Sequence, residues 1–131
     1  MEKNFDGWNK VKKKTDSRQK INFYFKEQEI WWLRTGINIG IESNGKGGEF
    51  TRPVLIIKKH NMNSCLIVFL TTKPKIGKSK ICLDEIKYPE IFANISQLKT
   101  IDSKRLSSKM FFLDRKNFKK IKRSIRKFND L

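Results

Sequence analysis

Short apolar runs separated by polar connections fill the middle of the chain, and a helical period occurs only near its two ends. Residues 30–33, 53–57 and 65–70 combine β-branched, leucine and aromatic side chains, which is typical of buried strands. Shorter runs predict further strands at 81–83, 91–95, 98–101 and 110–113. Gly, Pro, Asn, Asp and Lys gather in the predicted connections, which cover 36–48, 58–64, 73–80, 84–90 and 102–108.

The last segment has the period of an amphipathic helix. One apolar stripe is formed, at spacings of three, four and three residues, by Phe118, Ile121, Ile125 and Phe128. Asp114 is a suitable N-cap, so the predicted helix covers 114–128. Its opposite face carries only Lys and Arg among its charged residues.

The first 28 residues differ from the rest and are expected to form a basic N-terminal extension. Phe5, Trp8 and Val11 recur at helical spacing, which predicts a short helix over about 4–15. A polar stretch follows, and the strand pattern starts at Glu29. We therefore expect an extension at 1–28 and one domain at 29–131, a mainly β (α+β) fold built as a small barrel with a C-terminal helix.

Composition limits the setting in which the protein works. An apolar fraction of 37% over 131 residues suffices for one modest core. No apolar run approaches the length of a membrane span, and the charged N-terminus has no apolar segment of a secretion signal. Cys65 and Cys82 stand apart, with no CxxC pair or Cys/His cluster, and are expected to be reduced, buried thiols. These features favour a cytoplasmic protein.

The net charge of +17 points to a polyanionic partner. It is concentrated near the C-terminus, because residues 99–131 carry twelve Lys and Arg against three Asp and Glu. Lysine and arginine placed on phosphates give salt-dependent affinity for nucleic acids. An acidic protein is the other partner that this charge suits, and a merely soluble surface is the alternative.

Several common catalytic arrangements do not fit. Residues 40–46 have the spacing of a phosphate-binding loop, but Gly47 stands where Ser or Thr would hold magnesium, and no helix pattern follows. His60 is the sole histidine and falls in a polar turn, which excludes a two-histidine ribonuclease. The carboxylates are scattered without the spacing of metal ligands, so no metal or other cofactor is predicted.

Chemistry based on a cation and a hydroxyl remains. Arg52 opens one apolar strand, and Thr71 and Thr72 close the next. If these strands pair as a hairpin, Arg52 and Thr71 meet at one rim of the sheet, where they could bind a phosphate and stabilise charge on it. A surface ion pair for Arg52 and a backbone contact for Thr71 are the alternative.

Four motifs occur in the order in which they occur in the MazF/PemK toxins. The chain resembles this family through Glu29-Ile30-Trp31-Trp32, a glycine-rich loop followed by Arg52-Pro53-Val54, Leu70-Thr71-Thr72, and Ser96-Gln97-Leu98-Lys99-Thr100-Ile101-Asp102. The resemblance covers about residues 28–128. It implies an SH3-like, PemK/CcdB-type β-barrel, usually a homodimer.

The resemblance also implies an activity. The protein would be the toxin of a type II toxin–antitoxin system and a metal-independent endoribonuclease, or mRNA interferase. It would cleave single-stranded RNA at a short sequence through attack by the 2′-hydroxyl, leaving a 2′,3′-cyclic phosphate and a 5′-hydroxyl. A cognate antitoxin with an acidic tail would cover the RNA groove.

The family's site residues carry over to some positions and not to others. Arg52 and Thr71 match the catalytic arginine and threonine. Lys99 replaces an arginine of the family, and Asn94 and Ser96 stand where some relatives have a catalytic Arg and Asp. Candidate RNA contacts, from the loops next to the site and from the last motif, are Lys46, Thr72, Lys73, Lys75 and Lys99. Two other functions stay open: a non-catalytic nucleic-acid-binding barrel, and a toxin of the same fold that acts on a protein such as DNA gyrase.

Overall fold

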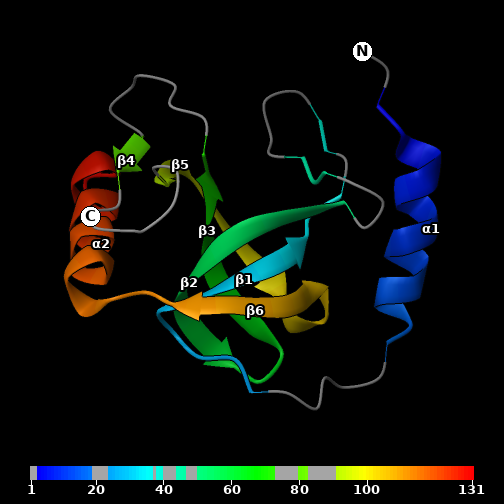
Figure 1. Cartoon of the computed structure of the whole chain (residues 1–131), viewed down its shortest axis with the longest axis horizontal. Coiled ribbons are helices and arrows are strands. Elements are labelled where there is room, and N and C mark those ends of the chain that lie inside the picture. Colours follow the sequence, from blue (N-terminus) through cyan, green and yellow to red (C-terminus); the bar gives the residue numbers. More distant parts are fainter. Residues whose placement is uncertain are drawn as a thin grey trace.

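One antiparallel sheet of six strands forms the body of the protein. The computed structural model describes residues 3–18, 24–36, 38–39, 44–46, 50–72, 80–82 and 91–131 (Figure 1). In chain order, the elements are α1 (Phe5–Asp16), β1 (Glu29–Arg34), β2 (Thr51–Asn61), β3 (Ser64–Thr71), β4 (Lys80–Cys82), β5 (Phe92–Asp102), the 3-10 helix η1 (Ser103–Arg105), β6 (Leu106–Phe112) and α2 (Arg115–Phe128). The sheet has the strand order β4-β5-β3-β2-β1-β6.

The sheet is buried on both faces, which explains the continuous apolar runs of its central strands. One face packs against α2, whose Phe118, Ile121 and Ile125 meet side chains of the sheet such as Leu55 and Val68. The opposite face encloses a second cluster, here called the inner core: Phe25, Trp31, Leu33, Val54, Ile56, Cys65, Ile67, Phe69, Ile101 and Leu106. Irregular pairing between several strands allows the sheet to curve around it.

The predicted fold class is confirmed: the protein is mainly β and barrel-like, with a C-terminal helix and an N-terminal helix. The barrel is open, because the edge strands β4 and β6 do not pair with each other within the described residues. The helix α2 begins after the predicted cap, and the Asp114 carboxylate accepts a hydrogen bond from the Asn117 backbone N–H at 3.0 Å. That bond lowers the pKa of the Asp114 carboxyl.

Two predicted connections were wrong because polar residues continue the strands. β2 runs through Asn61, so the turn contains only Met62 and Asn63, and His60 lies on the exposed end of a strand. The predicted turn at 102–108 is largely η1 and the start of β6. Leu106, the first residue of β6, is completely buried.

The predicted strands at 91–95 and 98–101 are one strand, β5. Its partner residues in β3 are adjacent, Val68 opposite Leu98 and Phe69 opposite Asn94, so β5 holds three extra residues in a bulge. The Ser96 hydroxyl donates to Asn94 Oδ1 at 2.7 Å within this bulge. Polar residues that suggested a break in the strand therefore stabilise an irregularity inside it.

Candidate functional site

The β2–β3 hairpin predicted from sequence is present, and it places the start of β2 beside the end of β3. The antiparallel register pairs Val54 with Phe69. Continued by two residues, this register sets Arg52 opposite Thr71, which in turn pairs with Phe92 of β5. Residues two apart on a strand share a face, so Arg52 and Thr71 lie on the side of the inner core, at its open end.

Arg52 is half-buried and is held through one edge of its guanidinium. Its Nε–H donates to the backbone carbonyl of Asn44. Burial lowers the pKa of the Arg52 guanidinium from its ordinary value, but an arginine stays charged at neutral pH. Its two Nη nitrogens make no hydrogen bond to any residue that the structure describes. A positioned cation with unused donors at the rim can bind an anion.

Residues 44–46, the segment that holds Arg52, are themselves hydrogen-bonded to the barrel. Lys46 and Thr51 form a two-bond antiparallel bridge, with N···O distances of 2.9 and 3.0 Å. The Gly45 N–H donates to the Gly36 carbonyl at 2.6 Å, and the Gly36 N–H donates to the Phe50 carbonyl at 3.1 Å. A Cβ at Gly45 would lie 1.8 Å from the Phe50 carbonyl oxygen, so only glycine fits this close approach.

The N-terminal helix supports this same segment. Trp8 is buried, with its ring 5.8 Å from the ring of Phe50 between centroids. Gly36, at a φ of +79°, lies so close that a Cβ there would be 2.0 Å from the Trp8 ring. Arg34 Nη1 donates to Thr15 Oγ1 at 3.3 Å, and Lys3 Nζ donates to the Asn38 carbonyl at 2.8 Å.

Sequence reasoning missed Trp8, Gly36 and Asn44 as parts of the site's support. The signal for Trp8 was its position on the apolar side of a short helix, but nothing in the pattern says which glycine that side would meet. The carbonyl of Asn44 carries no signal in sequence, because every residue has one.

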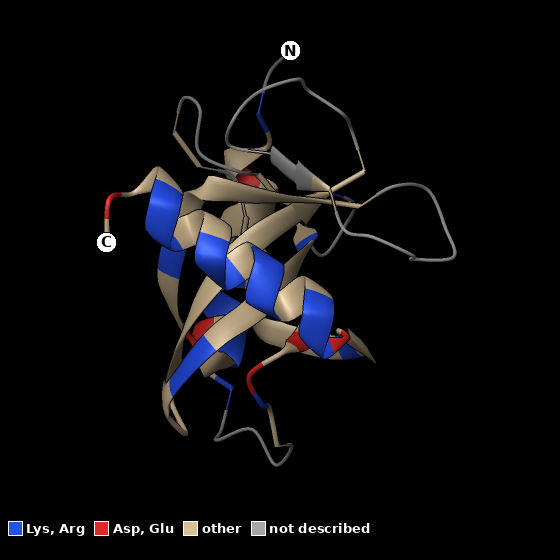
Figure 2. Cartoon of the chain, turned by 90° about the vertical axis from the view of Figure 1, so that its left-hand side faces the viewer, with Lys and Arg blue, Asp and Glu red and all other residues tan. Residues whose placement is uncertain are grey.

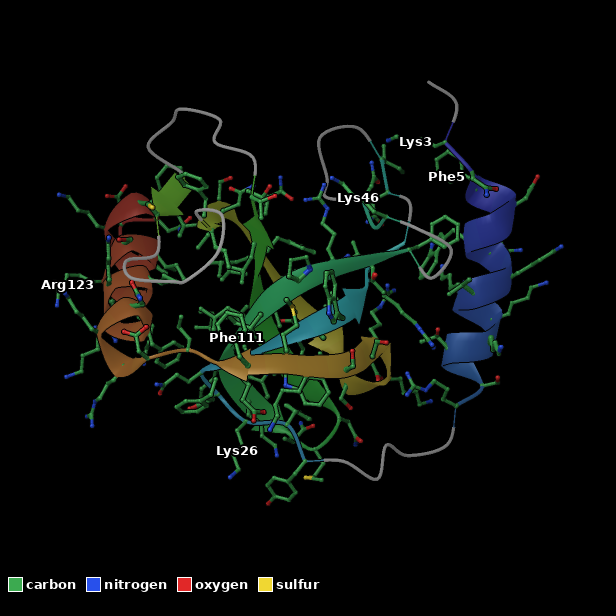
Figure 3. All side chains as sticks on the ribbon, viewed as in Figure 1. Lys3, Phe5, Lys26, Lys46, Phe111 and Arg123 are labelled. Carbon is green, nitrogen blue, oxygen red and sulfur yellow. The ribbon has the colours of Figure 1, made fainter. Side chains whose placement is uncertain are left out.

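The predicted RNA contacts lie at different places. Lys46 is exposed on the segment beside β2, near the rim (Figure 3), and Thr72 is exposed directly after β3. Lys99 is exposed but pairs with Ile67, four residues along β3 from Thr71, which is about 13 Å at the rise of a strand. The structure therefore does not bring Lys99 to the rim. Lys73 and Lys75 lie outside the described residues.

Asn94 and Ser96 occupy the bulge of β5, one strand away from Thr71. Asn94 is buried and pairs with Phe69, and its side-chain oxygen accepts from the Ser96 hydroxyl. These two neutral side chains satisfy each other. They supply no charged acid or base to the rim.

The remaining candidate groups are separate from the rim. Cys65 is free and buried in the inner core, where burial, and next the negative charge of Asp102, raises the pKa of its thiol to about 12. Cys82 likewise forms no disulfide but is only half-buried, so the prediction that both thiols are buried was wrong for this one. Within the described residues no three His, Cys, Asp or Glu side chains gather as metal ligands, and no helix is long and apolar enough to span a membrane.

Comparison with known protein families identifies the class of protein to which this open barrel belongs. The family of PemK-like, MazF-like toxins of type II toxin–antitoxin systems matches residues 26–128. The chain belongs to this family. No curated protein sequence matches the chain.

Solved structures show the same fold at low sequence identity. MazF from Deinococcus radiodurans (Form-I) superposes with a TM-score of 0.68 at 11% identity, covering 84% of this chain and 100% of that one. An endoribonuclease in complex with its cognate antitoxin, from Mycobacterial species, has a TM-score of 0.62 at 14% identity, with 80% and 94% covered. The Mycobacterium tuberculosis toxin MazF-mt6 has a TM-score of 0.60 at 15% identity, with 79% and 97% covered.

Proposed function

We propose that this toxin is a metal-independent, sequence-specific endoribonuclease that cleaves single-stranded RNA at the rim formed by Arg52 and Thr71. The observation that carries the proposal is the register of β2 and β3, which sets these two residues on adjacent strands and on one face. Membership of the toxin family and the likeness to a solved endoribonuclease support it. Lys46 and Thr72 lie close enough along the chain to add contacts to the RNA backbone.

The reaction is an internal transfer at phosphorus. The ribose 2′-oxygen bonds to the adjacent phosphorus, the bond from phosphorus to the 5′-oxygen breaks, and a 2′,3′-cyclic phosphate and a 5′-hydroxyl result. The proton of the 2′-hydroxyl leaves to solvent, and the 5′-oxygen gains one. Negative charge grows on the non-bridging oxygens in the transition state, where the Nη donors of Arg52 stabilise it. The Thr71 hydroxyl donates to one of these oxygens.

The hydrogen bond from Arg52 Nε to the Asn44 carbonyl contributes to the rate of cleavage in this proposal. Because Asn44 fixes the guanidinium before substrate arrives, little reorganisation is required when charge develops. Half-burial also weakens the screening of Arg52 by water. As a base Arg52 would be poor, since its protonated form dominates at neutral pH.

The partners follow from the same proposal. The toxin acts on cytoplasmic RNA, and a cognate antitoxin with an acidic segment covers the basic surface, as a neighbour solved with its antitoxin suggests. A homodimer is part of the proposal. Exposed apolar side chains on the adjacent strands β1 and β6, namely Trp32, Met110 and Phe112, support a protein contact there.

The test is single-turnover cleavage of a labelled, mixed-sequence RNA in EDTA. Arg52→Ala is expected to slow cleavage by about 10²–10³-fold, the usual effect of losing a donor to a developing oxyanion. Thr71→Val is expected to cost about 10–100-fold, and Thr71→Ser should recover most of the rate. Lys58→Ala is the matched control, since it removes one charge from the same strand about 20 Å from Arg52.

The alternatives give different results. RNA that is bound but never cut by the wild type would favour a non-catalytic binding barrel. Absence of both cutting and binding, together with inhibition of DNA supercoiling by gyrase, would favour a toxin with a protein target. Equal rates for wild type and Arg52→Ala would remove Arg52 from the mechanism.

A further inference from the structure

The outer face of α2 is strongly basic. Its fourteen residues include eight Lys and Arg and no Asp or Glu. Seven of the eight are exposed: Arg115, Lys116, Lys119, Lys122, Arg123, Arg126 and Lys127. Figure 2 looks onto α2 from outside the sheet and shows the Lys and Arg positions as blue bands along the helix. These seven residues are called the α2 surface below.

A surface needed only for solubility would mix the two signs of charge. None of the seven cations lies within ion-pair distance of a carboxylate of the described residues. Lys119 and Arg123, and again Lys122 and Arg126, are like charges four residues apart, an arrangement that destabilises a helix. By contrast, α1 carries Asp6 and Asp16 among its lysines. The cations of the α2 surface therefore repel one another, and no ion pair within the described residues offsets this repulsion.

The helix α2 contacts β4, the edge strand of the sheet that lies near the rim. Lys120, the eighth cation, donates from Nζ to the Cys82 carbonyl at 2.9 Å. Cys82 pairs with Phe92, and Phe92 pairs with Thr71. At a strand spacing of about 4.8 Å, only two strand intervals separate β4, where α2 is attached, from Thr71. A chain that leaves the rim across β5 and β4 and turns over this edge of the sheet therefore reaches α2 next.

We propose that the α2 surface binds the phosphate backbone of RNA that extends from the rim. The choice of RNA as the polyanion rests on the proposed function. Cations one helical turn apart suit a repeating row of phosphates and read no sequence.

The chemistry of this face favours RNA over other acidic partners. An acidic protein segment that folds on binding anchors itself with apolar side chains, and the only exposed large apolar residue within α2 is Phe128, at its end. A membrane-surface helix needs its apolar face free, whereas Phe118, Ile121 and Ile125 are in the core.

The test compares two variants that each remove four charges. One carries Lys116→Gln, Lys119→Gln, Arg123→Gln and Arg126→Gln on α2. The matched control carries glutamine in place of four exposed lysines of α1: Lys10, Lys12, Lys13 and Lys14. Binding of a 2′-O-methyl oligonucleotide of about 24 nucleotides, which cannot be cleaved, is measured by fluorescence anisotropy over a range of salt concentrations. A third variant exchanges Lys and Arg at the four α2 positions and keeps the charge.

The α2 variant is expected to bind at least tenfold more weakly. The slope of log K against log salt should fall by up to about 2.8, since each lost contact to single-stranded nucleic acid contributes about 0.7. The α1 control and the charge-keeping variant should retain the wild-type slope. The thermal stability of the α2 variant should not be lower than that of the wild type, because the repulsion between its cations is relieved.

Equal slopes for the α2 variant and wild type would overturn the inference. So would a variant that binds the oligonucleotide normally but loses affinity for a glutamate-rich peptide, because the face would then serve an acidic protein. Failure of the proposed function is a separate result: wild-type protein that leaves RNA uncut, yet binds the oligonucleotide through α2, contradicts cleavage and supports this inference.

Discussion

The contact between Trp8 and Gly36 ties the N-terminal helix to the segment that holds Arg52, and its strength can be measured. Two changes act on it from opposite sides: Trp8→Ala removes the ring, and Gly36→Ala adds a Cβ that would stand 2.0 Å from the ring. Both changes leave the inner core untouched, since neither residue belongs to it.

The magnitudes follow from the geometry. Truncation of a buried Trp costs about 3–5 kcal/mol in a core, and we expect the lower end because Trp8 anchors a helix at the edge of the fold. Alanine at the positive φ of Gly36 costs about 1–2 kcal/mol by itself. In the wild-type background the added Cβ also expels the ring, so Gly36→Ala should lose most of the docking energy as well.

The two changes should therefore be strongly non-additive. Once Trp8 is gone, Gly36→Ala should cost only its backbone share of about 1–2 kcal/mol, which gives a coupling of about 2–3 kcal/mol in a double-mutant cycle. The assay is urea unfolding followed by far-UV circular dichroism, with the m-value checked for each variant. Additive effects, within about 0.5 kcal/mol, would refute the contact.

Three further predictions concern stability and thiol chemistry. Glu29 is buried and accepts from the Trp31 indole N–H at 3.2 Å, so Glu29→Ala should destabilise the fold by about 2–4 kcal/mol in urea titrations, whereas an unchanged midpoint would contradict its structural role. Asp114→Ala should cost about 1 kcal/mol at pH 7. Because the pKa of the Asp114 carboxyl is lowered on folding, this difference should be full above the ordinary value of 3.8 and vanish as the pH falls through the folded-state pKa, and a difference that persisted in acid would be inconsistent with the cap. Iodoacetamide should label Cys82 before Cys65 in the native protein, as mass spectrometry of peptides would show. The raised pKa of the Cys65 thiol also predicts that the free energy of unfolding falls as the pH rises from 9 toward 12, and Cys65→Ala should remove this loss.

The parts of the fold that the sequence predicted are those governed by local pattern. The apolar runs that became β2 and β3 needed no tertiary information, and the stripe through Phe118 and Ile121 defined α2. The hairpin between consecutive strands then brought Arg52 beside Thr71, because neighbouring strands joined by a short turn pair antiparallel.

The misjudged parts depend on contacts between distant segments. Ser96 reads as a break, yet β3 pairs with β5 on both sides of the bulge and keeps it one strand. Leu106 follows charged residues, yet it is buried in the inner core. The role of Trp8 depends on a glycine 28 positions away, and Lys99 lies along the strand from the rim because the register, which the sequence does not encode locally, sets it opposite Ile67.

In the proposed mechanism the 2′-oxygen of RNA attacks the phosphate held by Arg52 and Thr71, and the chemistry of the product ends is a direct test of that attack. Purified wild type and Arg52→Ala are each incubated with one RNA in EDTA, and the fragments are weighed by mass spectrometry. Wild type alone should give upstream fragments with the mass of a 2′,3′-cyclic phosphate and downstream fragments with a 5′-hydroxyl, and it should not cleave when the attacking ribose is replaced by deoxyribose. Fragments ending in a 5′-phosphate, or cleavage at the deoxyribose, would contradict this mechanism.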